Sequence, residues 1–264
     1  MSEEFVKTGR LEALEFEVAG IKWLADAEET GGAKMVEVRG LSDAGLALTR
    51  LEDGFASAPA ARAFGAALAR THAAGAPGWG AAPPTWTSPQ ANKGMMPMSV
   101  VPAGEKFQFN SFGQWLVSER LQPVVEAAAT NGDLPAEDEN RFERLYQWLL
   151  DGDFDSPQPR LVKDPAARLH GDLWSGNLMW GPSGVVLIDP TSYGGHAETD
   201  LAECGLFGTP YMKDIYAGYN SVSPLAHGWE DRVALHRLYM LTLHLALFGA
   251  GYLRSVQAIL ERYV

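Results

Sequence analysis

Two short segments constrain this chain more than any other part of it. The first reads HGDLWSGN (170–177) and the second reads VVLIDP (185–190). Asp172 and Asn177 lie five residues apart, and Asp189 follows twelve residues after Asn177, at the end of a hydrophobic run. The Gly-Pro-Ser-Gly sequence between the two segments predicts a tight hairpin, which would return Asp189 next to Asn177. We therefore expect a fold in which two carboxylates and one amide meet.

These three side chains have the chemistry that phosphoryl transfer requires. A carboxylate must accept the proton of the attacking hydroxyl, and oxygen ligands must hold Mg²⁺ against the phosphates of ATP. The Asp-x-x-x-x-Asn spacing is that of a protein-kinase catalytic loop, so we interpret Asp172 as the catalytic base and Asn177 as a metal ligand. Asp189 is interpreted as the second Mg²⁺ ligand, because this ion prefers hard oxygen donors. Asp and Asn are also common in ordinary turns, but both segments in this order favour the catalytic interpretation.

The chain as a whole reads as a small mixed front part and a larger, mostly helical back part. In the front part, apolar spacing predicts a strand at 3–7, a helix at 11–27, and strands at 35–39 and 47–51. In the back part, the alanine-rich segment 58–73 predicts a helix. Further helices are expected at 111–131, at 136–150 and beyond 200, and 185–188 is expected to be a buried strand. The segment 75–102 is rich in glycine and proline but contains Trp79 and Trp86, which favours an ordered loop over a linker.

Charge and hydropathy argue against several function classes. The formal net charge of −12 disfavours a general nucleic-acid-binding protein, which needs a basic surface for phosphates. The most apolar stretch, 233–253, is interrupted by His236, Arg237 and His244, so we expect a buried helix and no membrane span. The N-terminus has no secretory pattern, and the single cysteine, Cys204, has no partner for a disulfide; both favour the cytoplasm. The sequence leaves the oligomeric state open.

The motifs identify a resemblance to a known family. HGDLWSGN and LIDP, together with GGHAETDLAE (194–203), resemble the fructosamine kinase (ketosamine-3-kinase) family, and the similarity extends over 64–80, 111–132 and 247–252. This family is a branch of the aminoglycoside-phosphotransferase and choline-kinase group. The resemblance implies an α+β, bilobal, protein-kinase-like (aminoglycoside phosphotransferase-like) fold, with a truncated N-lobe over 1–52 and a mainly helical C-lobe over 53–264.

The resemblance also implies a nucleotide site in the front part of the chain. Lys7 matches the lysine that pairs with the α- and β-phosphates of ATP, and Glu17 matches the helix glutamate that holds this lysine. The connection formed by Arg50, Leu51 and Glu52 matches the hinge whose backbone meets adenine. A compact ammonium such as that of Lys7 suits phosphate binding.

Further residues are expected to support the loop or to contact the acceptor. His170 is interpreted as a prop for the catalytic loop, and Asp200 as an acceptor of backbone hydrogen bonds beneath it. Trp174 is interpreted as a wall of the sugar pocket. His196 and Glu198 follow the metal aspartate closely, where a substrate could reach them, and are hypothesised to contact it.

The resemblance implies phosphorylation of a ketosamine, free or protein-linked, at its third carbon, which favours elimination of the adduct and so deglycation. A kinase for another small hydroxyl compound, an aminoglycoside or an amino alcohol, is the first alternative. Family members begin with a glycine-rich hairpin that covers the phosphates, whereas here only six residues precede Lys7. This departure motivates the second alternative, a catalytically weak kinase-like binding module, because exposure to water weakens the electrostatics of such a site.

Overall fold

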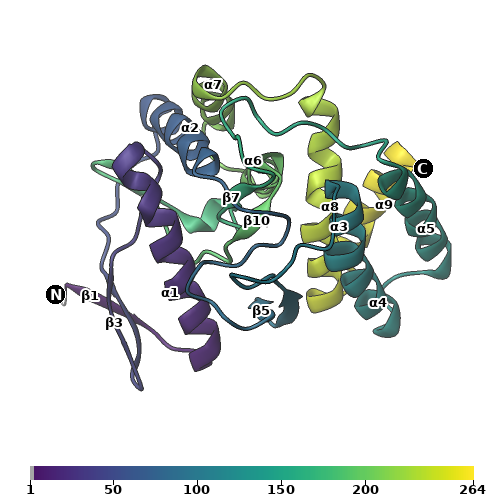
Figure 1. Ribbon diagram of the computed structural model, residues 1–264, viewed down its shortest axis with the longest axis horizontal. Helices are drawn as coiled ribbons and strands as arrows, with labels where there is room; N and C mark the ends of the chain where they lie inside the picture. The colour runs from purple at the N-terminus through teal and green to yellow at the C-terminus, as the bar shows by residue number, and fades with distance from the viewer. Residues whose placement is uncertain (1–2) are drawn as a thin grey trace.

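The computed structural model describes residues 3–264, and its front part is a three-stranded antiparallel sheet covered by one helix. The strand order is β1 (Glu4–Lys7), β4 (Gly45–Thr49) and β3 (Val38–Ser42). Leu46 and Leu48 alternate along β4 and are both buried against the helix α1 (Leu11–Ala25). Strand β1 lies at the edge of this sheet, at the end of the molecule opposite to the C-terminus (Figure 1).

A second sheet joins the front part to the catalytic segments. Strands β8 (Leu178–Gly181) and β9 (Gly184–Leu187) form the expected hairpin, in which Gly181 pairs with Gly184 across the turn. The short strand β2 (Lys34–Met35) adds to β9 in parallel, and the Val36 amide donates to the Leu187 carbonyl at 2.9 Å. A segment from the front part is thus hydrogen-bonded directly to the strand that leads to Asp189.

The back part is mainly helical, and two small two-stranded sheets flank the catalytic loop. These strands are β5 (Gln90–Lys93) with β6 (Met96–Ser99), and β7 (Ala167–Leu169) with β10 (Tyr193–Gly195). The helices are α2 (Ala58–Ala73), α3 (Phe112–Leu116), α4 (Gln122–Thr130), α5 (Ala136–Asp151), α6 (Ala197–Cys204), α7 (Met212–Val222), α8 (Trp229–Phe248) and α9 (Leu253–Tyr263). Three short 3₁₀ helices are η1 (Asp26–Thr30), η3 (Ser175–Asn177) and η4 (Ala250–Tyr252), and one π-helical turn is η2 (Val117–Leu121).

Helices α2 and α7 cross with their backbones unusually close, and glycine makes this possible. A β-carbon built on Gly65 would lie 2.0 Å from the Ile215 carbonyl oxygen, and one on Gly218 would lie 1.9 Å from the Arg62 carbonyl oxygen. Each helix therefore needs a glycine where the other passes. The crossing fixes α7 against α2 (Figure 1), and α2 in turn packs on β9.

The described residues form two large hydrophobic cores and one small cluster around Trp23. One lies among α3, α4, α5, α8 and α9 and includes Phe142, Leu145 and Leu238. The other contains residues of α1 and β4 together with residues of α2, α7 and the β8–β9 hairpin, such as Leu24 and Leu187. The second core thus contains residues from both expected lobes, 1–52 and 53–264. The front part therefore shares one core with the segments that carry the catalytic loop.

Most of the expected elements are present, with differences at their ends. The helix predicted at 58–73 is confirmed, whereas α1 ends at Ala25 and continues as the 3₁₀ turn η1. The strand expected at 35–39 is wrong as one element, because the chain passes there from β2 to β3. The segment 75–102 is ordered, as predicted, but it contains the β5–β6 hairpin, which apolar spacing did not indicate. Within residues 3–264 no helix has the length and apolar character needed to cross a bilayer, and 233–248 belong to the partly buried α8.

Candidate active site

The loop after β7 is held from below by a buried carboxylate. Asp200 Oδ2 accepts a hydrogen bond from the His170 amide at 2.7 Å, and its Oδ1 accepts one from the Gly171 amide at 2.9 Å. His72 Nε2 lies 3.2 Å from the same Oδ2. Burial alone would raise the pKa of Asp200, but the contacts with His72 and the loop amides outweigh it and leave the pKa lowered. The charged carboxylate thus makes the backbone contacts expected of it.

His170 connects this loop to the segment that carries Asp189. Its Nε2 lies 2.9 Å from the Ile188 carbonyl, its Nδ1 accepts the Asp172 amide at 3.2 Å, and its own carbonyl accepts the Thr191 amide at 2.9 Å. These contacts assign the proton to Nε2 and a lone pair to Nδ1. Burial lowers the pKa of His170 and so favours this neutral form.

Asp172 and Asn177 contact each other directly. Asn177 Nδ2 donates to the Asp172 carbonyl at 2.7 Å and to Asp172 Oδ2 at 3.1 Å. The Asn177 side chain is buried, whereas the Asp172 side chain is 26% exposed. Because its nitrogen is already used, Asn177 keeps its side-chain oxygen for another ligand. The Asn177 carbonyl also accepts the Ile188 amide at 3.2 Å, which sets the residue beside the start of the Asp189 turn.

Asp189 has an uncommon backbone conformation. Its φ is 55°, in the left-handed region, and among the described non-glycine residues it shares a positive φ only with Tyr211. Its Oδ1 lies 3.0 Å from Lys7 Nζ, which also contacts Glu17 Oε2 at 2.7 Å. Lysine from β1, glutamate from α1 and aspartate from the β9 turn therefore form one charged group. Uncommon backbone conformations cluster at functional sites, where surrounding contacts maintain them.

The neighbouring carboxylates keep the Lys7 ammonium protonated. Burial alone would lower the pKa of Lys7, but the hydrogen bond and charge of Glu17, and then Asp189, outweigh it and raise the pKa. For Glu17 burial is the largest effect, and it leaves the pKa of that carboxyl raised despite Lys7. Lys7 is thus a cation at neutral pH, at the place where anionic phosphates are expected.

A cleft of about 360 Å³ opens beside this group. Lys7 and Asp189 lie along it, and Arg50 and Leu51 line it together with apolar side chains from both sheets, which are Phe5, Val36, Leu48, Met179 and Ile188. Glu52 lines a neighbouring hollow beside the β8–β9 turn. An apolar cleft with a few charged groups at one end suits a flat base attached to phosphates.

The residues present suit a magnesium ion. Asn177 offers an amide oxygen and Asp189 a carboxylate that is 40% exposed, which are the hard oxygen donors this ion prefers while it keeps several waters. Lys7 occupies the Asp189 carboxylate here, so a bound ion would share that carboxylate with the lysine. The donor set therefore fits a Mg²⁺ ion held by Asn177 and Asp189.

Comparison with known proteins decides the family. A model of the fructosamine kinase family matches residues 2–264. The chain belongs to the fructosamine kinase family. The resemblance inferred from the HGDLWSGN and LIDP motifs is thereby confirmed.

Individual members of the fructosamine kinase family and of its wider fold group are similar to this chain. A probable ketoamine kinase of Lactiplantibacillus plantarum is 38% identical over 147 residues, which are 55% of this chain and 50% of that protein. The chain spans about half the length of the curated relatives it matches. A crystal structure from Thermobifida fusca, assigned as a fructosamine-3-kinase, has a TM-score of 0.83 at 33% identity and covers 97% of this chain and 81% of that one. An ADP-bound aminoglycoside phosphotransferase has a TM-score of 0.55 at 11% identity, covers 96% and 84%, and confirms the expected fold.

Against this family background, a buried lysine that sequence reasoning missed lies behind Asp172. Lys93, the last residue of β5, is 3% exposed and donates to the Gly171 carbonyl at 2.5 Å. Its Nζ also lies 3.6 Å from Asp172 Oδ1 and 3.3 Å from Glu203 Oε1. No motif marks Lys93 in the sequence, because it reaches the loop only through the fold of the segment 75–102.

Trp174 stands on the open side of the loop. Its side chain is 38% exposed, and its ring meets the ring of Phe207 edge-to-face with centroids 6.1 Å apart. Phe207 continues to His244, which packs on Phe248 and Tyr252, so a row of rings leads away from the loop. A β-carbon on Gly176 would lie 2.2 Å from the Trp174 ring, so the ring covers the backbone of that glycine. This surface is where an acceptor could stack.

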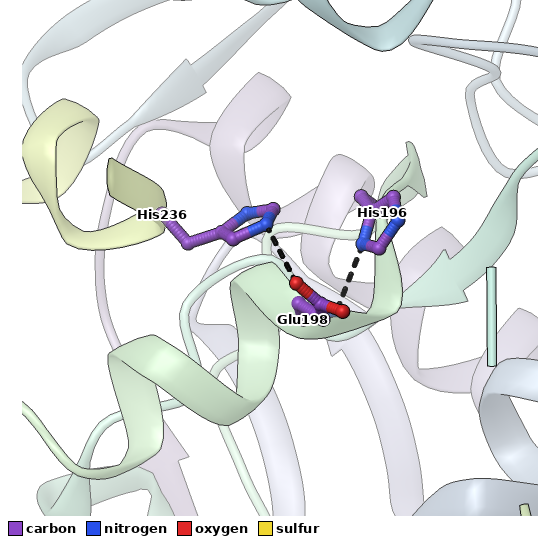
Figure 2. A group of neighbouring side chains, drawn as sticks. All are labelled: His196, Glu198 and His236. Carbon is purple, nitrogen blue, oxygen red and sulfur yellow. Dashed lines mark hydrogen bonds and ion pairs between the residues drawn. The ribbon is translucent and has the colours of Figure 1, made fainter. Parts of the chain in front are cut away.

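His196 and Glu198 are placed differently from the hypothesis that they contact substrate. Figure 2 shows the two imidazoles of His196 and His236 on either side of Glu198. All three residues are buried, and both Glu198 oxygens pair with Arg232 at 2.6 and 2.8 Å. With His196 1% exposed and Glu198 3% exposed, these side chains present almost no surface to a substrate. Their atoms lie close enough to suggest a metal site, but the Arg232 guanidinium already supplies the countercharge, so we interpret the cluster as structural.

This buried cluster predicts acid sensitivity of the fold. Burial lowers the pKa of His196 to about 3, whereas an unfolded histidine titrates near 6.5. Below pH 6.5 the unfolded chain therefore binds more protons, and stability is lost as the pH falls, by about 1.4 kcal/mol per unit at most. We expect this loss to lower the urea midpoint of the parent between pH 7.5 and 5.5. Glu203, whose pKa burial raises to about 8, contributes with the opposite sign in this window, but equally in the parent and in a His196 variant. The change should be smaller in His196→Asn, which keeps an acceptor for the Glu198 amide; an equal change in both proteins would contradict this.

Proposed function

We propose that the protein transfers the γ-phosphoryl group of ATP to a hydroxyl of a ketosamine sugar. The observation that carries the proposal is the direct contact of Asp172 with Asn177, on a loop that His170 ties to the Asp189 turn. This arrangement puts a proton acceptor and two oxygen ligands on connected, rigid segments. Membership of the fructosamine kinase family supports the same reaction.

Each side chain of the site has a separate role in the proposed transfer. Asp172 orients the acceptor hydroxyl and takes its proton as the oxygen attacks the γ-phosphorus. The bond to the bridging oxygen breaks and ADP leaves. Lys7, kept cationic beside Glu17, neutralises charge on the α- and β-phosphates. Asn177 and Asp189 would hold Mg²⁺, which when bound supplies charge neutralisation along the phosphate chain.

The cleft between the two sheets accommodates the adenine in this proposal. Leu48 and Met179 supply apolar surface from opposite sides of the cleft, and the backbone at Arg50 and Leu51 runs along its edge. Strand β1 is an edge strand of the front sheet, and Lys7 at its end lies at the charged end of the cleft, beside Asp189.

The acceptor is assigned from the family and from the surface beside the loop. The similar proteins are named ketoamine kinase and fructosamine-3-kinase, which supports a ketosamine phosphorylated at its third carbon and a role in deglycation. Trp174 and Phe207 provide an aromatic wall next to Asp172 on which a sugar ring can stack. The acceptor is either a free ketosamine or one linked to a protein.

A panel of acceptors tests the proposal. ADP release would be measured with ATP and Mg²⁺ and with ribulosamine-type, fructosamine-type, aminoglycoside and amino alcohol acceptors, each against a control without acceptor. We expect turnover with the ketosamines only. Turnover with another acceptor alone would replace the substrate class. No turnover, and no ATP binding by calorimetry at millimolar nucleotide, would instead favour a kinase-like binding module.

Replacement of Trp174 separates the acceptor site from the nucleotide site. In Trp174→Ala we expect the KM of the ketosamine to rise by about three- to tenfold, which corresponds to the loss of one stacked ring. Trp174→Phe should retain most of the affinity because it keeps an aromatic face. Steady-state kinetics with each substrate varied in turn would show the KM of ATP unchanged. An equal rise for ATP would place Trp174 outside the acceptor site.

A further inference from the structure

The carboxylate of Asp172 is contacted on both of its oxygens by different donors. Asn177 Nδ2 lies 3.1 Å from Oδ2, and Lys93 Nζ lies 3.6 Å from Oδ1. Lys93 also donates to the carbonyl of Gly171, the residue directly before Asp172, at 2.5 Å. The lysine thus touches both the reacting group and the backbone that carries it.

Lys93 is a costly residue in this position. It is 3% exposed, and a buried ammonium destabilises a fold unless it is paired and hydrogen-bonded. Glu203, a fully buried residue of α6, supplies the pairing with oxygens 3.3 and 3.4 Å from Lys93 Nζ. The ring of Tyr239 lies 5.4 Å from the same nitrogen and adds a cation–π contact.

The electrostatics of Lys93 and Glu203 favour a protonated Lys93 beside Asp172. Burial alone would lower the pKa of Lys93, but the charges of Glu203 and then Asp172 outweigh it and leave the pKa raised. For Glu203 burial is the dominant effect, and it raises the pKa to about 8 despite Lys93. Lys93 therefore keeps its proton while the carboxylates of Glu203 and Asp172 beside it are charged.

We propose that Lys93 is a positioning residue for the reaction: it orients the Asp172 carboxylate from the side opposite to Asn177, while Glu203 only makes its burial possible. The inference rests on the proposed function of Asp172 as the base. Replacing an entire buried ion pair by apolar residues of similar size is often neutral or stabilising, whereas removing one partner is destabilising. A role in the structure and a role in the reaction can therefore be separated.

Two variants separate them. Lys93→Met with Glu203→Leu removes the pair and fills its space; Glu203→Gln removes only the countercharge and leaves Lys93 on Asp172 and Gly171. For the double variant we expect a thermal midpoint close to that of the parent and KM values for ATP and ketosamine within about threefold. We expect its kcat to fall by about 10- to 100-fold, because a small misplacement of a reacting group has effects of this size. For Glu203→Gln we expect a lower thermal midpoint and a kcat within about threefold of the parent.

The results that would overturn the inference are distinct from those that would overturn the function. A parent chain without turnover on any acceptor would overturn the proposed function and this inference with it. An active parent and a double variant with unchanged kcat would overturn the inference alone, as would a Glu203→Gln variant that loses as much kcat as the double variant. If the double variant does not fold, the neutral pair Lys93→Gln with Glu203→Gln replaces it. We again expect a lower kcat, and an unchanged kcat would again overturn the inference.

Discussion

Asp172→Asn is expected to lower kcat by about 10²- to 10⁴-fold, the range that a general base contributes. The amide can still accept the hydrogen bond from Asn177 Nδ2 through its oxygen, so the loop geometry should persist. What is lost is the proton acceptor for the attacking hydroxyl. The measurement is single-turnover transfer from ATP to a ketosamine, with calorimetric ATP binding determined on the same preparation.

The control for Asp172→Asn is binding. We expect the affinity for ATP with Mg²⁺ to change by less than about threefold, because Asn177, Asp189 and Lys7 are untouched. If transfer proceeds at the parent rate, Asp172 is not the base. If ATP affinity falls in parallel with kcat, the substitution has disturbed the nucleotide site and the chemical role is unsupported.

Gly171→Ala is expected to destabilise the protein by about 3 kcal/mol or more and to abolish most activity. Gly171 has a φ of 78°, and a β-carbon there would lie 2.0 Å from the Thr191 carbonyl oxygen. The left-handed conformation costs a non-glycine residue about 1–2 kcal/mol. Overpacking against backbone adds about 1–3 kcal/mol. Urea unfolding of the two proteins measures the difference in free energy of unfolding.

Gly132→Ala is the matched control for this substitution. Gly132 has nearly the same φ, 77°, but a β-carbon there would meet no atom within 4 Å. This substitution should cost only the left-handed backbone conformation, about 1–2 kcal/mol, and should leave kcat unchanged because Gly132 lies just after α4, away from the loop. Equal destabilisation by the two alanines would show that the contact with Thr191 contributes nothing.

The catalytic segments were predictable because their geometry is set locally. Asp172 and Asn177 belong to one loop, and a four-residue turn between β8 and β9 fixes where the chain comes back, so spacing alone placed Asp189 near them. The helix at 58–73 was likewise clear, because the segment is rich in alanine, the strongest helix former; the structure adds a cap at Ser57. Such features need no knowledge of distant contacts.

Residues that depend on distant contacts were missed or misplaced. Lys93 reaches the loop through a hairpin in a glycine- and proline-rich segment, where periodicity carries no signal. His196 and Glu198 follow Asp189 closely in sequence, which favoured a substrate contact, but α6 begins there and turns them toward Arg232 and His236 in the interior. The local sequence does not indicate that α8 covers the first residues of α6.

The parallel pairing of β2 with β9 has a mechanical consequence. The front sheet is tied to the hairpin at β2, so it cannot swing over the cleft as a free flap. Rotation of β1, β4 and β3 relative to the catalytic loop has to be absorbed by the path from β1 through α1 to β2 and by two short stretches, the residues between β2 and β3 and those between β4 and α2. Both stretches border the nucleotide cleft, at Val36 and at Arg50 to Asp53, so stiffness in these few peptide units would set how readily nucleotide enters and leaves.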